Sequence, residues 1–421
     1  MKIASKRRLK ITAATLAFLG LSAQAFAGGL YIYEMIPTEV GTAGAGSAAK
    51  AQNASTVFTN PAGMTYIDHN EIQAGATLMY LNAPIHNLAG TTSTGRGGDT
   101  SEWFGGGNFN LIMPIDDQWT FGLAVQNFFG LSLNWQDDWV GRYTSTKEWL
   151  IAPQIQPTIA YKVNDWVSVG LGLGLTVGYL KTYFAVYNPD TTPIDGRAKL
   201  RDTAFAVQGN LGVMLQPNED LRIGIRYLTE TKLDFNPSLS VKGVQNPSTA
   251  IGLQALGGLD LGLYMPQALN IAAFYQLNEQ WAILGDFGWE DWSRFGKLDV
   301  GLGATGNLST VNIHTKDIYH YGIGTQYQFD ETLMLSAGFS FDSQLLDNAN
   351  RSLILPMKDM YRYGVGFEKE MNEDFTIGAG LDYLWEGDIP IKPTQTAIGT
   401  VNVLYTSVYF VFASVYGVWK F

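Results

Sequence analysis

The sequence predicts an all-β fold, a 14-stranded antiparallel transmembrane β-barrel with an N-terminal hatch, or plug, inside its lumen. Three observations predict it. Apolar residues alternate with polar residues or glycine along many segments, very short connections alternate with long ones, and no uninterrupted run of about 18 apolar residues follows the N-terminal region. We expect residues 1–27 to be a signal peptide, 28–69 the hatch and 70–421 the barrel.

The first 27 residues have the pattern of a secretory signal peptide. A basic region precedes an apolar run from Ile11 to Leu21, and Ala25-Phe26-Ala27 is a small-x-small cleavage site. The whole chain has 27 basic and 38 acidic residues, so losing the five basic residues of this segment leaves a formal charge of −16. Nucleic acid is therefore not expected as a partner. The chain has no cysteine, which excludes disulfides and thiolate metal sites.

The segment from Val40 to Asp68 is predicted to be the part of the hatch that fills the lumen. Its first half is made almost entirely of small residues, which can pass through a crowded space, and we expect neither a helix nor a strand there. Asn60-Pro61-Ala62 follows. Proline locks its own φ and biases Asn60 toward an extended conformation, which leaves the asparagine amide free to bind other groups. An ordinary loop turn is the alternative.

Period-two alternation predicts the barrel strands. It is clearest from Val167 to Tyr179 and from Phe375 to Trp385, where one face is apolar and the other is polar or glycine. A soluble sandwich also alternates, but so long a chain would need several such domains, and no linker or composition shift marks a boundary. The polar face predicts a lumen with charges of both signs, most of them structural: Arg222, Arg226, Asp286, Glu290, His314, Lys316, His320, Arg362, Glu368 and Asp382.

The connections favour an outer-membrane barrel, which has short periplasmic turns and long external loops. Six turns and seven loops give fourteen strands, with both ends on the periplasmic side. Aromatic residues that follow four of the turns, such as Trp119 and Trp281, predict a girdle at the inner interface. The short polar turns are Asp116-Asp117, Asn164-Asp165, Asn218-Glu219-Asp220, Asn278-Glu279-Gln280, Asp330-Glu331 and Asn372-Glu373-Asp374.

Several motifs in a fixed order resemble the FadL-type outer-membrane transporters of long-chain fatty acids and aromatic hydrocarbons, the OMPP1/FadL/TodX family. The resemblance covers nearly the whole mature chain. Its carriers are Asn60-Pro61-Ala62, DDWVGRY (137–143), QPTIAYKVND (156–165), WEDWSRF (289–295), KDIYHYGIGTQY (316–327) and NRSLILPMKDMYRYGVG (350–366).

The resemblance implies a function and a location. We expect uptake of hydrophobic small molecules, long-chain fatty acids first, in the outer membrane of a Gram-negative bacterium. The ligand would bind in a groove among the outer loops and then in an inner apolar pocket, and leave sideways through a gap in the wall that the hatch controls. The expected partners are this ligand and outer-membrane lipid. We expect a monomer, with no cofactor and no metal.

The third strand, from Trp119 to about Gly130, is where the family kinks inward, and Asn127-Phe128-Phe129-Gly130 breaks the alternation here. A kink frees backbone N–H and C=O groups, which need new partners in a membrane. We expect the Asn60 amide, presented by Pro61, to supply them. The alternative is an ordinary strand end that runs into a loop.

Lys316 and Lys181 are candidates for binding a ligand carboxylate, because relatives that carry fatty acids place basic residues at these positions. Solvated rim charges are the alternative, above all for Lys181, whose parity points outward. Arg142 is expected to tie the third external loop to the barrel by a bidentate bond.

Other classes of function fit the sequence less well. The four histidines show no motif with a serine and no metal-ligand spacing, so we expect neither an enzyme nor a metal site. A general porin would not need a forty-residue insert before its first strand. Uptake of an aromatic or aliphatic hydrocarbon is the main alternative, and the sequence does not decide between these substrates.

Overall fold

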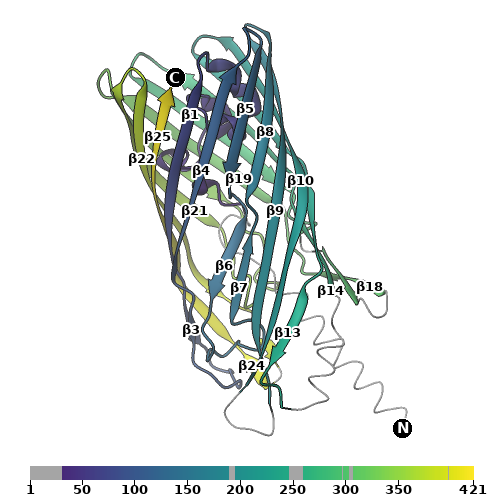
Figure 1. Cartoon of the computed structure of the whole chain (residues 1–421). Coiled ribbons are helices and arrows are strands. Elements are labelled where there is room, and N and C mark those ends of the chain that lie inside the picture. The colour runs from purple at the N-terminus through teal and green to yellow at the C-terminus, as the bar shows by residue number, and fades with distance from the viewer. Residues whose placement is uncertain (1–30, 189–194, 246–258, 296, 303–306, 397) are drawn as a thin grey trace.

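The computed structural model describes residues 31–188, 195–245, 259–295, 297–302, 307–396 and 398–421. The expected signal peptide and its cleavage site lie outside the described residues. The chain forms a tall barrel of tilted strands, and the segment before the first strand lies inside one end of it (Figure 1).

Fourteen antiparallel strands close the barrel, as predicted. Each pairs with the next in chain order, and the last pairs with the first through Glu71↔Lys420. Closure gives the backbone groups partners inside the hydrocarbon layer, where water is absent. The wall strands are β1 (Glu71–Asn82), β4 (Glu102–Pro114), β5 (Trp119–Gln126), β8 (Gln154–Asn164), β9 (Val167–Val186), β10 (Gly196–Asn218), β11 (Leu221–Leu228), β15 (Ala268–Gln276), β16 (Trp281–Glu290), β19 (Ile318–Gln328), β20 (Leu333–Asp342), β21 (Met360–Asn372), β22 (Phe375–Pro390) and β25 (Val403–Lys420).

Shorter strands occupy the long connections, which the sequence had suggested only as loops. Five of them, β2, β3, β6, β7 and β13, join the sheet of the wall. β12, β14, β17 and β18 form a separate four-stranded sheet, and β23 pairs with β24. These strands are β2 (Pro84–Asn87), β3 (Gly98–Asp99), β6 (Gly130–Asn134), β7 (Lys147–Ile151), β12 (Thr231–Phe235), β13 (Ser238–Lys242), β14 (Leu259–Met265), β17 (Lys297–Leu302), β18 (Asn307–Asn312), β23 (Thr394–Thr396) and β24 (Gly399–Val401).

The short turns share one local structure. The Asp116 carboxylate accepts hydrogen bonds from the backbone N–H groups of Gln118 and Trp119, at 2.9 and 2.8 Å. Asn164, Asn218, Asn278 and Asp330 make the same pair of bonds, and Asn372 makes the first of them. A side chain that satisfies the turn backbone explains why each turn begins with Asn or Asp. These turns define the short-turn end of the barrel, which is the periplasmic end in bacterial barrels.

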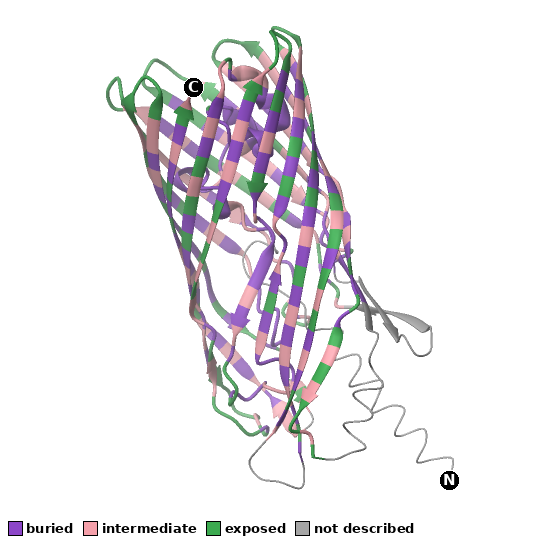
Figure 2. Cartoon of the chain, in the orientation of Figure 1, coloured by how far each residue is buried: buried purple, intermediate pink, exposed green. Residues whose placement is uncertain are grey.

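The two faces of the wall differ as the alternation predicts, and exposed and buried residues form stripes across the strands (Figure 2). Rings near the short turns pair across strands, as in Trp281–Tyr327 at 4.5 Å. A second belt lies toward the loops, with Tyr383–Tyr409 at 5.5 Å. Tyr409 and Trp419 lie in the same strand, roughly 34 Å apart along it, which a tilt of about 40° reduces to about 26 Å. This height matches a bilayer core.

The hatch consists of short helical turns, so the expectation of no helix there was wrong. None of the described helices is long and apolar enough to cross a membrane. Such short turns are unstable alone and depend on packing. Wall glycines allow this packing, because a Cβ on Gly224 would come 1.8 Å from the Ala48 carbonyl oxygen and one on Gly338 would come 1.9 Å from that of Thr42. The hatch helices are η1 (Tyr33–Met35), η2 (Val40–Thr42), α2 (Ser47–Lys50), α3 (Thr56–Thr59) and η3 (Pro61–Tyr66).

Candidate functional site

The wall is interrupted between β4 and β6. β5 pairs with only part of β4, from Phe109 to Pro114, and ends at Gln126. The chain then leaves the sheet and resumes as β6, which pairs with β7. Among the described residues, the loop-side half of β4 pairs with β1 alone, so its other edge faces β6 without a ladder. We call this gap the lateral opening.

A cavity of about 370 Å³ lies at the lateral opening. Most of its lining is apolar, and Glu102, Asn127, Ser132 and Lys147 are the polar side chains. Apolar lining at a break in the wall would let a hydrophobic ligand pass between the lumen and the lipid. The apolar lining residues are Ile32, Met35, Met79, Leu81, Phe104, Leu131, Trp149, Ile151 and Phe410, with Gly105 and Gly130.

The residues that leave the sheet turn into the lumen. Phe128 and Phe129 are fully buried, and Phe128 stacks on Tyr31 with ring centroids 5.2 Å apart. The Phe128 carbonyl accepts the Ile32 N–H at 2.7 Å, and the Phe129 carbonyl accepts the Ala152 N–H at 3.0 Å. The chain therefore leaves the sheet within the predicted stretch, Asn127 to Gly130, and the N-terminal end of the hatch holds it.

Asn60 has other partners than expected. Its backbone is extended, at φ −163° and ψ 104°, and its side chain is fully buried. The amide donates to the carbonyls of Ala48, at 2.7 Å, and of Val213 in β10, at 3.1 Å, and its oxygen accepts the Ala62 N–H that begins η3. The expectation that this amide binds groups freed at the kink was wrong, because Ile32 and Ala152 bind them. Asn60 fastens the hatch to β10 instead.

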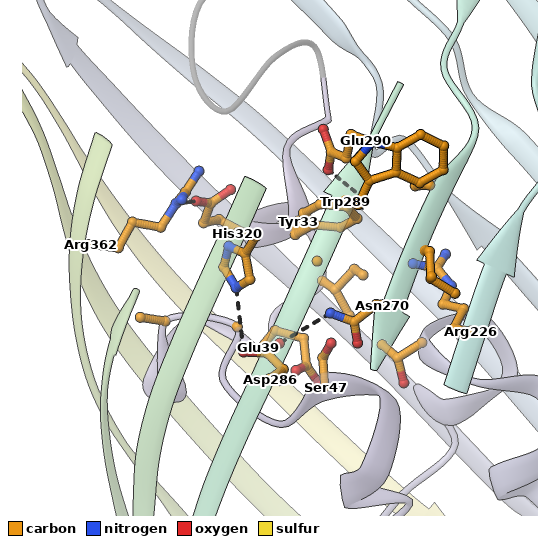
Figure 3. Close-up of a pocket in the computed structure, with 18 residues that line it drawn as sticks. Tyr33, Glu39, Ser47, Arg226, Asn270, Asp286, Trp289, Glu290, His320 and Arg362 are labelled. Atoms are coloured by element: carbon orange, nitrogen blue, oxygen red, sulfur yellow. Dashed lines mark hydrogen bonds and ion pairs between the residues drawn. The ribbon is translucent and has the colours of Figure 1, made fainter. Parts of the chain in front are cut away.

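A charge cluster lies between the hatch and the wall (Figure 3). Arg362 forms ion pairs with Asp342 and with Glu34 of the hatch. His320 is 2.6 Å from Asp342 and 3.5 Å from Asp286. The cavity beside them measures about 60 Å³, room for a few water molecules but not for an acyl chain. Here the lumen charges pair with one another and with the hatch, as the sequence suggested.

An apolar column fills the lumen from the outer loops to the kink. At its outer end Trp135 stacks on Trp139 at 5.5 Å, and the Trp135 indole N–H donates to the Tyr405 hydroxyl at 2.7 Å. At its inner end Trp292 packs on Tyr31 at 5.6 Å. Sequence reasoning missed this column, although apolar residues within expected loops were a signal for it. Its other buried members include Phe58, Phe128, Phe129, Phe295, Leu345, Leu346, Leu353, Ile354 and Leu355.

Neither candidate cation lines the cavity at the lateral opening, although Lys181 lies beside Trp149, which does. Lys316 is half exposed near the outer loops and pairs with Asp347. Lys181 lies on the outward face of β9, with its amine 5.4 Å from the Trp149 ring, so it does not point into the lumen. Among the described residues, neither lysine side chain forms a hydrogen bond or ion pair with a residue of the apolar column.

Arg142 ties loop segments together, but not by a bidentate bond to one carboxylate. Its Nε donates to one carboxylate oxygen of Asp195 at 2.8 Å, and the Tyr143 hydroxyl donates to the other oxygen at 2.8 Å. Arg142 also reaches the Trp139 carbonyl at 3.3 Å. Burial, and then the bond to Asp195, raise the pKa of Tyr143. These contacts give Arg142 a structural place beside the outer loops.

The fold and the opening define a class of protein: a plugged outer-membrane β-barrel whose wall is open on one side. The family model described as "Outer membrane protein transport protein (OMPP1/FadL/TodX)" matches residues 18–418. The chain belongs to this family of outer-membrane transport proteins, which are not enzymes. Within the described residues, no group of three or more His, Cys, Asp and Glu side chains could hold a metal ion.

Curated relatives agree with this assignment. The chain is 26% identical over 365 residues to a "Long-chain fatty acid transport protein" of Salmonella typhi, covering 80% of this chain and 82% of that protein. It is 26% identical over 392 residues to "Outer membrane protein P1" of Haemophilus influenzae, covering 83% of each.

Solved structures show the same fold. A Pseudomonas aeruginosa FadL homologue superposes with a TM-score of 0.78 at 20% identity, covering 91% of this chain and 98% of that one. The Pseudomonas putida toluene transporter TodX superposes with a TM-score of 0.67 at 17% identity, covering 95% and 99%. At these identities the likeness concerns architecture and not substrate.

Proposed function

We propose that the protein takes up hydrophobic small molecules, long-chain fatty acids first, and releases them sideways into the bilayer through the lateral opening between β4 and β6. The observation that carries this proposal is the break in the wall, where an apolar cavity of about 370 Å³ adjoins the hatch. A closed wall would leave only a path along the lumen into periplasmic water.

Lateral release follows from the hydrophobic effect. Each methylene that leaves an apolar environment for water costs about 0.8 kcal/mol, so a chain of some fifteen methylenes would lose on the order of 12 kcal/mol in the periplasm. Release into lipid avoids this cost. The apolar column supports the same path, because a hydrophobic ligand can take the place of its side chains in an apolar environment. A general porin, by contrast, has a polar, water-filled lumen.

The hatch and the lateral opening are coupled in this proposal. Ile32 of the hatch holds the Phe128 carbonyl, and Phe58 packs on the Phe128 ring at 4.6 Å. A ligand that enters the column and displaces these rings therefore also loosens the hatch. Asn60 fastens the other side of the hatch to β10 and limits how far it moves.

Fatty acids are favoured over uncharged hydrocarbons because curated relatives at 25–26% identity carry the name long-chain fatty acid transport protein. Lys316 is the cation we propose for the carboxylate, which would replace Asp347 as its partner. Lys181 does not suit this role, because its side chain lies on the outward face of β9. An uptake assay that pairs oleate with 1-octadecene separates the two substrate classes.

The test of lateral release is to obstruct the opening. Gly105 lines it, and a Cβ there meets nothing closer than the Thr77 carbonyl oxygen at 3.9 Å, so Gly105→Trp should fold. Gly285→Trp is the matched control, because Gly285 lies on the lipid side of an intact ladder with similar space, its nearest atom being at 3.8 Å. Oleate uptake should fall several-fold for Gly105→Trp alone. Equal uptake by both variants would refute release through this opening.

A further inference from the structure

Cations gather on one outward face of the wall, just beyond the apolar band. On β9 the exposed residues Leu171 to Leu175 are followed by Tyr179 and then by Lys181. β10 carries three cations in alternate positions from Arg197 to Arg201. Strand pairing adds one residue from β7 and one from β13 on the same face. We call this set the basic patch: Lys147, Lys181, Arg197, Lys199, Arg201 and Lys242.

The patch places like charges directly opposite each other. Lys181 faces Arg201 across β9 and β10, and Arg197 faces Lys242 across β10 and β13. Such pairs destabilise a sheet. Among the described residues only Arg197 has a carboxylate partner, Asp137. The whole chain has 11 more acidic than basic residues, yet these cations cluster almost without acidic partners. Such a cluster is suited to bind an anion that the protein itself does not supply.

A hollow of about 560 Å³ lies within the patch. Lys181 and Arg201 line it together with the apolar groups of Trp149, Ile151 and Tyr179. Asp202 also lines it, but one oxygen of its carboxylate accepts the Asn236 N–H. Ile151 and Tyr179 lie on the membrane side of the hollow, and Lys181 and Arg201 lie on its loop side at the level of Trp149. Apolar surface followed by positive charge is the polarity that suits a lipid with an anionic headgroup.

We propose that the basic patch binds a phosphorylated glycolipid of the outer leaflet, with its phosphates on the cations and an acyl chain against Trp149 and Tyr179. The two like-charge pairs lie four residues apart along β10, roughly 13 Å. A disaccharide with a phosphate at each end spans a comparable distance, so each pair takes one phosphate. Lysine and arginine near a membrane surface each favour anionic lipid, and several together make the attraction strong.

The test uses the full-length mature protein in detergent and native mass spectrometry, with bisphosphorylated lipid A and its monophosphorylated form as probes. Wild-type protein should retain the bisphosphorylated form at least tenfold more strongly. Lys181→Gln with Arg201→Gln should remove this preference, while Lys181→Arg with Arg201→Lys should keep it. Lys162→Gln with Lys369→Gln is the control, because it removes the same charge at the short-turn end and should change nothing.

Three results would overturn the proposal. Unchanged lipid A binding by Lys181→Gln with Arg201→Gln would mean that the patch is a solvated rim. Displacement of the lipid by excess inorganic phosphate would mean a general anion site. A loss of oleate binding by this variant with lipid A binding intact would assign the cations to the transported substrate. Heat-modifiable migration of every variant on gels checks that each barrel is folded. The patch adjoins the lateral opening, since Lys147, Trp149 and Ile151 line that opening too, and normal oleate uptake by Lys181→Gln with Arg201→Gln would show that the two sites work independently.

Discussion

The wall has a continuous side and an interrupted side. β9 and β10 pair through twenty residues without a register shift, whereas β5 has eight residues and leaves the sheet after Gln126. Both obey the same alternation until Phe128 and Phe129. Two consecutive phenylalanines in a straight strand would put one ring among polar lumen groups, but both become fully buried when the chain turns inward. A local change in pattern is enough to convert a wall into an opening.

Removing the hatch should have the largest effect, because the hatch touches both sides of the wall. Deletion of residues 40–68 removes the segment that contacts Gly224 and Gly338, and we expect conductance to rise at least tenfold. Single-channel recording in planar bilayers measures this. An intact protein that already conducts as freely as the deletion variant would show that the hatch does not close the pore.

Phe128→Ala tests whether the kink on the interrupted side of the wall holds the hatch. It removes a fully buried ring that packs on Tyr31 and Phe58, a change that typically costs about 3–5 kcal/mol. The loss should appear as faster proteolysis of the hatch. Phe205→Ala is the control on the continuous side, where the ring is 77% exposed toward lipid. Equal protease resistance of the two variants would contradict the role of the kink in holding the hatch.

Asn60→Ala tests the fastening on the continuous side. It leaves the carbonyls of Ala48 and Val213 and the N–H of Ala62 without this partner, at a cost of about 1–3 kcal/mol. The barrel should stay folded and heat-resistant, but oleate uptake should rise, because a hatch that is no longer fastened to β10 moves further when a ligand displaces the rings at the kink. Asn82→Ala, which removes an amide hydrogen bond to the Ser407 carbonyl away from the hatch, should import normally. If Asn60→Ala imports oleate at the wild-type rate, Asn60 does not control the hatch and is only a turn residue.

Lys316→Ala should have the smallest effect, because Lys316 lies near the outer loops, away from both the continuous and the interrupted side of the wall. Its half-exposed pair with Asp347 contributes about 0–1 kcal/mol to stability. Oleate binding should weaken by about 1 kcal/mol, roughly fivefold, with 1-octadecene binding unchanged. Asp347→Ala, which frees the amine, should strengthen oleate binding. Equal losses for both ligands would assign Lys316 to the loops alone.

The barrel could be predicted from the sequence because its signals are local. Alternation along a strand fixes which face meets lipid, and an Asn or Asp that binds its own turn fixes the short connections. The residues Asn127 to Gly130 could be singled out for the same reason, since a break in alternation is visible in the chain itself.

The contacts of the hatch could not be predicted, because they join residues far apart in the chain. The bond from Ile32 to Phe128 leaves no local pattern, so the wrong part of the hatch, Asn60, was matched to the kink. The apolar column was missed for a related reason. Leu353 and Trp135 lie in segments that look like exposed loops, and only the fold brings them together inside the lumen.

The order of strand pairing has a consequence for how the barrel forms. Of the fourteen neighbour contacts in the wall, all but one join strands that follow each other in the chain, and the exception joins Glu71 to Lys420. Hairpins closed by tight turns cost little chain entropy and can form early. The pairing of β1 with β25 joins the two ends of the barrel chain and is by far the longest-range step. We infer that this seam closes last and that the hatch can enter from the side before it closes.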